Sequence, residues 1–170
     1  MSRTPSPTDA TRSAGTPRTL VIGLGNPILS DDGVGVHVVR RLRSRLEERR
    51  GIDLAEDCRG GLHLMERMIG YDRVLVIDAG RTGRPPGEVR VLSLHSLPSL
   101  HAGSAHDLDL PTALAVGRRA GAALPDPAGI RFLVIESQDV LSFGEQCTPA
   151  VAAAIERAAR VALDLLSDWR

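Results

Sequence analysis

Four residues of this 170-residue chain, in three separate segments, are candidates for proton transfer or metal binding by their types and positions. Asp31 and Asp32 stand in the stretch LGNPILSDDGVG, Asp78 ends the apolar run VLVID, and His106 lies in GSAHDLDLP. Two carboxylates and an imidazole suit a borderline divalent ion such as Ni²⁺, Zn²⁺ or Co²⁺. So few protein ligands leave coordination positions open for a substrate or for water.

Each of these residues also has an ordinary structural explanation. Carboxylates in the first turn of a helix, as expected for Asp31 and Asp32, interact favourably with the helix dipole by ~0.3–1 kcal/mol each. Asp78 suits the cap of a DAG turn through its own side chain, and His106 suits a solvent-exposed loop. If the strands that precede these acids are neighbours, two like charges lie close together, which raises a pKa or requires a cation.

The same stretch only partly resembles a nucleotide-binding turn. Gly23 and Gly25 match the start of a GxGxxG fingerprint, but Ile28 occupies the place of its third glycine, which allows close packing of helix and strand. Asp31 and Asp32 would also repel a pyrophosphate. The chain contains no lysine, which excludes a Walker-type phosphate lysine. We therefore expect no nucleotide cofactor.

Two nucleophile arrangements stay open at this point. Cys147 precedes a helix without a surrounding motif and is more typical of a small packed residue. Ser30, His106 and Asp78 are the types needed for a Ser–His–Asp assembly, although turn chemistry explains Ser30 equally well. The other histidines have no stronger claim from their spacing: His37, His63, His95 and His101.

The chemistry-bearing residues can meet only if the rest of the chain brings their loops together. Apolar runs alternate with helical patterns along the sequence. Buried strands are expected at residues 19–25, 52–57, 73–80, 88–94 and 130–138. Helices are expected at residues 31–48, 61–70, roughly 107–121 and from the N-cap Thr148 onward, with Pro149 at the first helical position.

This alternation predicts an α/β fold, a three-layer αβα sandwich with a mostly parallel, roughly five-stranded twisted sheet. In such sheets, ligands bind where loops leave the carboxyl ends of the strands. Asp32 stands in the turn after the first predicted strand, and Asp78 stands near the carboxyl end of the third. The first 18 residues, rich in Ser, Thr, Pro and Arg, are expected to form a disordered tail before a single domain at 19–170.

The overall composition argues against several classes of partner. The formal net charge is zero and acids are mixed with bases, so there is no basic stripe for nucleic acid and no polybasic membrane patch. No apolar run approaches the length of a membrane span, and the first residues lack the apolar segment of a secretory signal. We expect no nucleic-acid or membrane partner and a cytoplasmic location.

Five motifs, in their order and spacing, resemble the hydrogenase maturation endopeptidases, the family that processes the large subunit of [NiFe] hydrogenases. The motifs are VIGLGNPILSDDGVGVHVV, RGGLHLMERMIGYDRVLVIDA, SAHDLDLPTAL, LVIESQ and CTPAV. The resemblance covers nearly the whole chain after the tail. It implies an endopeptidase that removes a C-terminal peptide from the large-subunit precursor, its protein partner, once nickel has been inserted.

The resemblance also implies roles for individual residues. The implied catalytic and nickel-binding residues are Asp32, Asp78 and His106. The implied turn-shaping residues are Gly25, Asn26 and Asp31. In this family the nickel is expected to be carried by the substrate rather than kept by the protease as a cofactor.

One departure and several alternatives accompany the resemblance. The segment CRGG at 58–61 replaces a commoner Gly-Thr-x-Gly pattern and puts Arg59 at the hydroxyl position, which leaves the partner's identity open. Hydrolysis is open between a metal-activated water and acid–base catalysis by Asp32 or Asp78. Two other functions also stay open: a nickel-sensing chaperone of the immature subunit that does not cut it, and a metal-dependent hydrolase of another substrate.

Overall fold

The computed structural model describes residues 16–96 and 109–169, and its centre is one five-stranded sheet. The strands are β1 (Thr19–Leu24), β2 (Ile52–Asp57), β3 (Arg73–Gly80), β4 (Val89–Ser93) and β5 (Ile130–Glu136). Their order across the sheet is β2-β1-β3-β5-β4. The pairs β1–β2, β1–β3 and β3–β5 are parallel, whereas β4 runs antiparallel to β5.

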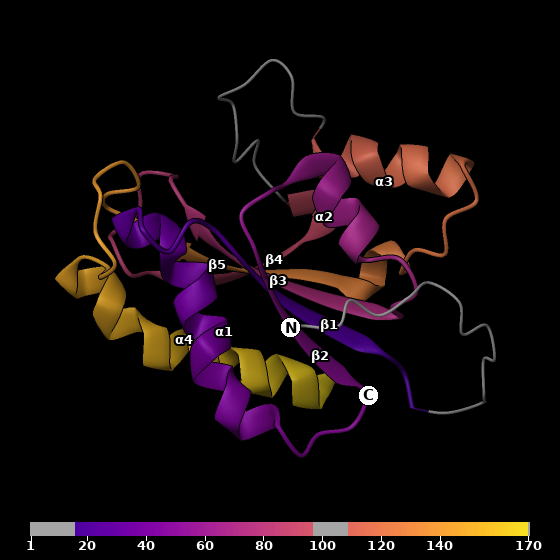
Figure 1. Cartoon of the computed structure of the whole chain (residues 1–170), viewed down its shortest axis with the longest axis horizontal. Helices are drawn as coiled ribbons and strands as arrows, with labels where there is room; N and C mark the ends of the chain where they lie inside the picture. The colour runs from indigo at the N-terminus through magenta and orange to yellow at the C-terminus, as the bar shows by residue number, and fades with distance from the viewer. Residues whose placement is uncertain (1–15, 97–108, 170) are drawn as a thin grey trace, which may run out of the picture.

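Helices cover both faces of the sheet, as Figure 1 shows. One face carries α1 (Val34–Leu46) and α4 (Pro149–Asp168), and the other carries α2 (Gly61–Arg67) and α3 (Leu110–Arg119). Three short 3-10 helices complete the described elements: η1 (Ser30–Gly33), η2 (Leu94–Ser96) and η3 (Pro127–Gly129). The predicted three-layer αβα sandwich is confirmed.

The central strand β3 shows why its sequence is a continuous apolar run. Leu75 and Ile77 pack into the core under α1 and α4, while Val74 and Val76 pack into the core under α2 and α3. All four side chains are fully buried. Because both faces are covered, neither set of alternating side chains is polar, and each buried side chain contributes about 1.5–3 kcal/mol.

The prediction of a helix at 31–48 is wrong about the first residue. The segment Ser30–Gly33 is the 3-10 helix η1, and α1 begins at Val34. Ser30, the first residue of η1, has a positive φ of 44°. This backbone conformation separates η1 from the preceding part of the chain. The start of α1 then lies directly against the sheet. A Cβ at Gly35 would overlap the carbonyl oxygen of Ile77 on β3. The segment after β1 therefore packs closely against the carboxyl end of β3.

Smaller differences appear at other ends of elements. The helix expected at 61–70 ends at Arg67, and Gly70 has a φ of +83°, a conformation that favours glycine. Most of the predicted tail, residues 1–15, lies outside the described residues. Arg18, at the end of that tail, donates its backbone N–H to the Asp72 carboxylate over 2.8 Å. Across residues 16–96 and 109–169, no helix combines the length and apolarity that a membrane span requires.

Candidate functional site

The carboxyl edge of the sheet brings two acids to the same level. Leu24, the last residue of β1, pairs with Asp57 on β2, and Gly23 pairs with Ile77 on β3, so Leu24 also lies level with Asp78. The strand before the acidic turn, β1, and the strand that contains Asp78, β3, are neighbours, so the condition set out from the sequence is met. By strand alternation, Asp57 and Asp78 lie on the face that α2 and α3 cover, about two strand spacings, or ~10 Å, apart.

Asp78 is a largely buried carboxylate at this edge, only 8% exposed. Its Oδ1 accepts the backbone N–H of Ala79 over 2.8 Å, so the side chain does fix the start of the following turn. This hydrogen bond fits the turn-capping role that the sequence suggests for Asp78.

Asp32 organises the turn between β1 and η1. Its Oδ2 accepts the backbone N–H of Asn26 over 2.7 Å, and its own N–H donates to the Leu29 carbonyl oxygen over 3.0 Å. Gly25 has a φ of +124°, and a Cβ there would overlap the carbonyl oxygen of Asp32. The turn therefore requires glycine at this position, and it holds the half-buried Asp32 carboxylate in one place.

Asp31, the other acid of the pair, is fully buried and serves a different part of the chain. Its carboxylate accepts the backbone N–H groups of Gln138, Asp139 and Thr148 over 2.8, 2.9 and 2.7 Å. The Thr148 hydroxyl also donates to it over 2.9 Å. Thr148 is the N-cap of α4 as predicted, but its hydroxyl binds Asp31 and makes no capping hydrogen bond. Asp31 thus fixes both ends of the loop 137–148.

His106 lies outside the described residues, so the structure does not show where the third predicted ligand stands. His101 is outside them as well. Within the part of the chain that is described, no three His, Cys, Asp or Glu side chains are grouped to hold a metal ion. The segment that contains His106 leads into α3, whose first residue is Leu110 and which covers the same face as Asp57 and Asp78.

The two alternative nucleophiles are engaged in the fold. The Ser30 hydroxyl donates to the Gln146 carbonyl oxygen over 3.3 Å and is buried. Burial and the nearby Asp31 carboxylate raise the pKa of Cys147 to about 11, which keeps it a neutral thiol near neutral pH. Its Sγ lies 3.8 Å from the Ser30 carbonyl oxygen. Both side chains therefore support the same turn.

An Asp–His pair at the same edge was not among the predicted site residues. His63 Nε2 on α2 lies 3.0 Å from Asp57 Oδ2. Burial raises the pKa of Asp57, but hydrogen bonds from the N–H groups of Arg59 and Cys58 and from His63 outweigh it and lower the pKa below its ordinary value. The signal was present in the sequence, because Asp57 ends a predicted strand just as Asp78 does.

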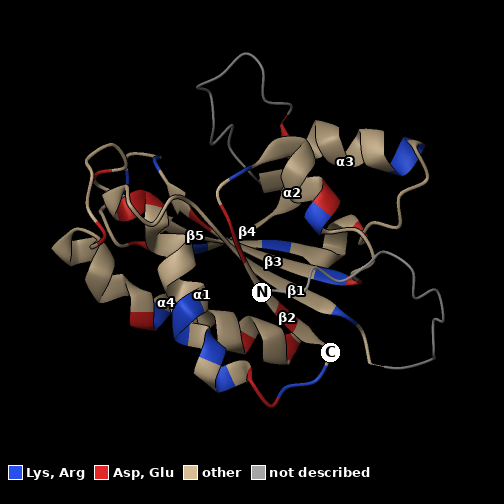
Figure 2. Cartoon of the chain, viewed as in Figure 1, with Lys and Arg blue, Asp and Glu red and all other residues tan. Residues whose placement is uncertain are grey.

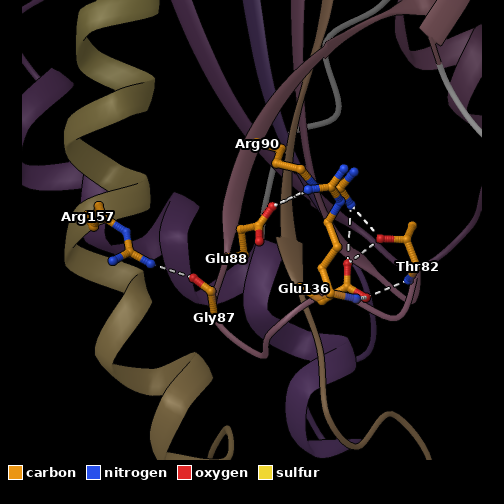
Figure 3. A network of polar contacts seen from close by, with 7 residues as sticks. Thr82, Gly87, Glu88, Arg90, Glu136 and Arg157 are labelled. Atoms are coloured by element: carbon orange, nitrogen blue, oxygen red, sulfur yellow. Dashed lines mark hydrogen bonds and ion pairs between the residues drawn. The ribbon is translucent and has the colours of Figure 1, made fainter.

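A third buried carboxylate, Glu136 at the end of β5, fixes the loop between β3 and β4 (Figure 3). It accepts hydrogen bonds from Thr82 N–H, from the Thr82 hydroxyl over 2.8 Å and from Arg84 N–H over 3.2 Å. Arg90 on β4 donates to it over 3.2 Å. Burial alone raises the pKa of Glu136, but the Thr82 and Arg84 hydrogen bonds lower it below its ordinary value. An open cleft of about 250 Å³ borders this network, lined by Arg81, Gly83, Arg84, Glu136, Ser137 and Gln138.

The charges around α1 are arranged along its axis (Figure 2). Asp31 and Asp32 precede its first residue, and Arg43 and Arg45 lie in its last turn. Acids at the amino end and bases at the carboxyl end both interact favourably with the helix dipole. The acidic turn is therefore compatible with helix stability, and its charge does not by itself require a ligand.

Comparisons with known proteins agree on one family. A family model described as hydrogenase maturation protease matches residues 36–165. The hydrogenase expression/formation protein HoxM of Azotobacter vinelandii is 27% identical over 155 residues, which is 89% of this chain and 73% of the relative. The hydrogenase 2 maturation protease of Escherichia coli is 29% identical over 107 residues, which is 61% of this chain and 65% of the relative.

A solved structure has the same fold. The hydrogenase maturating endopeptidase HybD from E. coli is 26% identical to this chain and superimposes with a TM-score of 0.71. The match covers 89% of this chain and 93% of HybD. The similarity therefore extends over most of both chains.

Proposed function

The chain belongs to the hydrogenase maturation protease family and is a peptide hydrolase; from this premise we propose that it removes the C-terminal extension of a [NiFe] hydrogenase large-subunit precursor after nickel insertion. The observation that carries the proposal is the parallel pairing of β1 with β3. This pairing brings the turn after β1 beside the carboxyl end of β3, near Asp78, at the edge of the sheet where ligands bind.

We propose further that Asp32, Asp78 and His106 recognise the nickel in the substrate. Carboxylate and imidazole groups are suitable ligands for Ni²⁺. Two carboxylates and one imidazole would bind a free ion weakly, but they would complete the coordination of a nickel centre that the precursor already holds. Cleavage would then depend on metal loading, because an empty precursor lacks the group that these residues recognise.

Two hydrolytic routes are compatible with this arrangement. In one, nickel polarises the scissile carbonyl or activates a water molecule. In the other, Asp32 or Asp78 transfers the proton between water and the leaving amine. The fixed position of Asp32 in the turn supports either route, because a reacting group must be held close to productive geometry.

The test is the intact mass of a large-subunit precursor from the same organism after incubation with this protein. Nickel-loaded and nickel-free precursors would be compared with wild type, Asp78→Asn, His106→Ala and the control Asp164→Asn, an exposed acid on α4. We expect loss of a C-terminal peptide only from the loaded precursor, with wild type and Asp164→Asn. An unchanged mass with every nickel-loaded precursor would overturn the proposal.

The same experiment separates the alternatives. A nickel-sensing chaperone would bind the loaded precursor without changing its mass. A hydrolase of another substrate would contain stoichiometric metal after purification and would cleave small peptides. The structural likeness to HybD over 93% of that endopeptidase favours the processing function over both.

A further inference from the structure

We propose that Ile28, Leu141 and Phe143 form an apolar docking ridge for the hydrogenase precursor, an inference that rests on the function proposed above. The three side chains are 49%, 77% and 86% exposed. Phe143 is one of only two phenylalanines in the chain. Large apolar side chains that are exposed together mark interaction surfaces. The name apolar ridge refers to these three residues.

Backbone pairing holds two members of the apolar ridge side by side. Leu29 forms an isolated parallel bridge with Gly144. The Gly144 N–H donates to the Ile28 carbonyl oxygen over 3.0 Å, and the Ser30 N–H donates to the Gly144 carbonyl oxygen over 2.8 Å. Ile28 and Phe143 each precede one member of the bridged pair, so they are neighbours across it.

The loop that carries Leu141 is fixed before any partner arrives. Asp31 binds both ends of the loop 137–148. Within the loop, Asp139 Oδ1 accepts the N–H groups of Leu141 and Ser142, each over 3.0 Å. A surface that is already ordered loses little conformational entropy on binding, so its exposed side chains are suited to anchor a partner.

The position of the apolar ridge beside the acidic turn indicates which partner binds to it. Ile28 lies two residues after Asn26, whose N–H donates to Asp32, so the ridge continues directly from the acidic turn. A second copy of this chain seated on the ridge would cover that turn and obstruct the substrate. The occupant compatible with turnover is the precursor itself, through an apolar segment close to the bond that is cut.

Charge beside the apolar ridge adds to this assignment. The open cleft lined by Arg81 and Arg84 begins at Gln138, where the ridge loop leaves β5. Arg84 pairs with Glu88 over 3.0 Å, and Arg81 adds a second guanidinium to the lining. An apolar segment with a neighbouring acidic group would find complementary surfaces on both, and such complementarity contributes mainly to specificity.

The test measures KM and kcat separately for processing of the nickel-loaded precursor. The variants are the double substitution Leu141→Ser/Phe143→Ser and the matched control Val116→Ser, which removes a 48% exposed apolar side chain from α3. Binding of the precursor to each immobilised protein gives Kd in parallel. We expect the double variant to raise KM and Kd by about tenfold with kcat within about threefold, and Val116→Ser to change none of them.

Unchanged KM and Kd in the double variant, or equal losses in Val116→Ser, would overturn the ridge. A wild-type dimer that the double variant converts to monomer, measured by sedimentation, would also overturn it by showing a self-association surface. If wild type binds the precursor without cutting it, the proteolytic function fails while Kd still decides the ridge. If wild type neither binds nor cuts, both proposals fail.

Discussion

Two loops at the carboxyl edge of the sheet are each fixed by a buried carboxylate, but the two carboxylates are stabilised by different kinds of partner. Asp31 accepts backbone and hydroxyl groups from residues 138–148, which are dipoles without net charge. Glu136 accepts similar groups from residues 82–84 and also pairs with the Arg90 guanidinium over 3.2 Å. One loop therefore depends on backbone geometry, and the other also depends on an ion pair.

This difference separates the two acids of the turn after β1. Asp31 makes four hydrogen bonds to the loop before α4 and is fully buried, so its carboxylate is part of the fold. Its neighbour Asp32 is only half-buried and binds Asn26 within the turn. The two adjacent carboxylates therefore differ in burial and in partners, and we propose that Asp32 is the one that contacts the substrate.

The largest effect on stability is expected for Asp31→Asn. Asn has only one acceptor oxygen. If that oxygen keeps the N–H groups of Gln138 and Asp139, the amide nitrogen faces the N–H of Thr148, and a repulsive contact replaces a charge-assisted hydrogen bond. We expect a loss of about 3 kcal/mol in the free energy of unfolding, measured by urea denaturation. The matched variant Asp32→Asn should lose about 1 kcal/mol or less. Equal losses in the two variants would contradict the separation of their duties.

A smaller effect is expected for Glu136→Gln. The Arg90 guanidinium also donates to the Thr82 hydroxyl over 2.8 Å, and this bond survives the substitution. The amide introduced by the substitution would keep one carbonyl acceptor for the backbone of the loop. We expect a loss of about 2 kcal/mol in urea denaturation. A loss as large as that of Asp31→Asn would show that the remaining hydrogen bond between Arg90 and Thr82 does not help to hold this loop.

The pH dependence of stability sharpens the same comparison. Hydrogen bonds lower the pKa of Glu136 despite its burial, so the folded protein binds the proton less readily than the unfolded chain. Its contribution is complete above the ordinary glutamate pKa of about 4.5 and is lost as pH falls through the lower folded value. We expect the urea midpoint of wild type to fall below pH 5 more steeply than that of Glu136→Gln. Parallel curves would contradict this.

The smallest expected effect is a difference in the chemical reactivity of the two cysteine thiols. This difference reports on the stability of the region around Asp31. Cys147 has a pKa raised to about 11, while Cys58 is exposed. Iodoacetamide at pH 8 should therefore modify Cys58 in the folded protein and Cys147 only after urea unfolding. Mass spectrometry of peptides gives the order of modification. Early modification of Cys147 in native protein would show that the turn around Asp31 opens readily.

The sequence predicted the strands better than the turns. The predicted strands at 52–57 and 73–80 match β2 and β3 at both ends. A short run of alternating or apolar residues with a clear start and end is enough to predict a strand from the local sequence. The 3-10 helix η1 could not be predicted in this way. Its conformation depends on contacts between Asp31 and residues 138–148, more than 100 positions away in the chain.

The candidate site was predictable in part for the same reason. Asp32 and Asp78 could be found because one follows a strand closely and the other stands near the carboxyl end of a strand, and the pairing of β1 with β3 joins those ends. Asp57 obeys the same rule, but its partner His63 belongs to a helical pattern that gives no sign of its contact with β2. The spacing of residues in the sequence predicts interactions within one helix or strand. It does not predict contacts between different elements, such as this one.

The measurement that most directly tests the division between Asp31 and Asp32 is the rate at which Asp32→Asn processes the nickel-loaded precursor, recorded beside its urea midpoint. We expect a midpoint close to that of wild type and a rate lower by about 100-fold or more. A wild-type rate would contradict the role of Asp32 in the site. A loss of rate matched by a loss of stability as large as that of Asp31→Asn would show that both acids serve the fold.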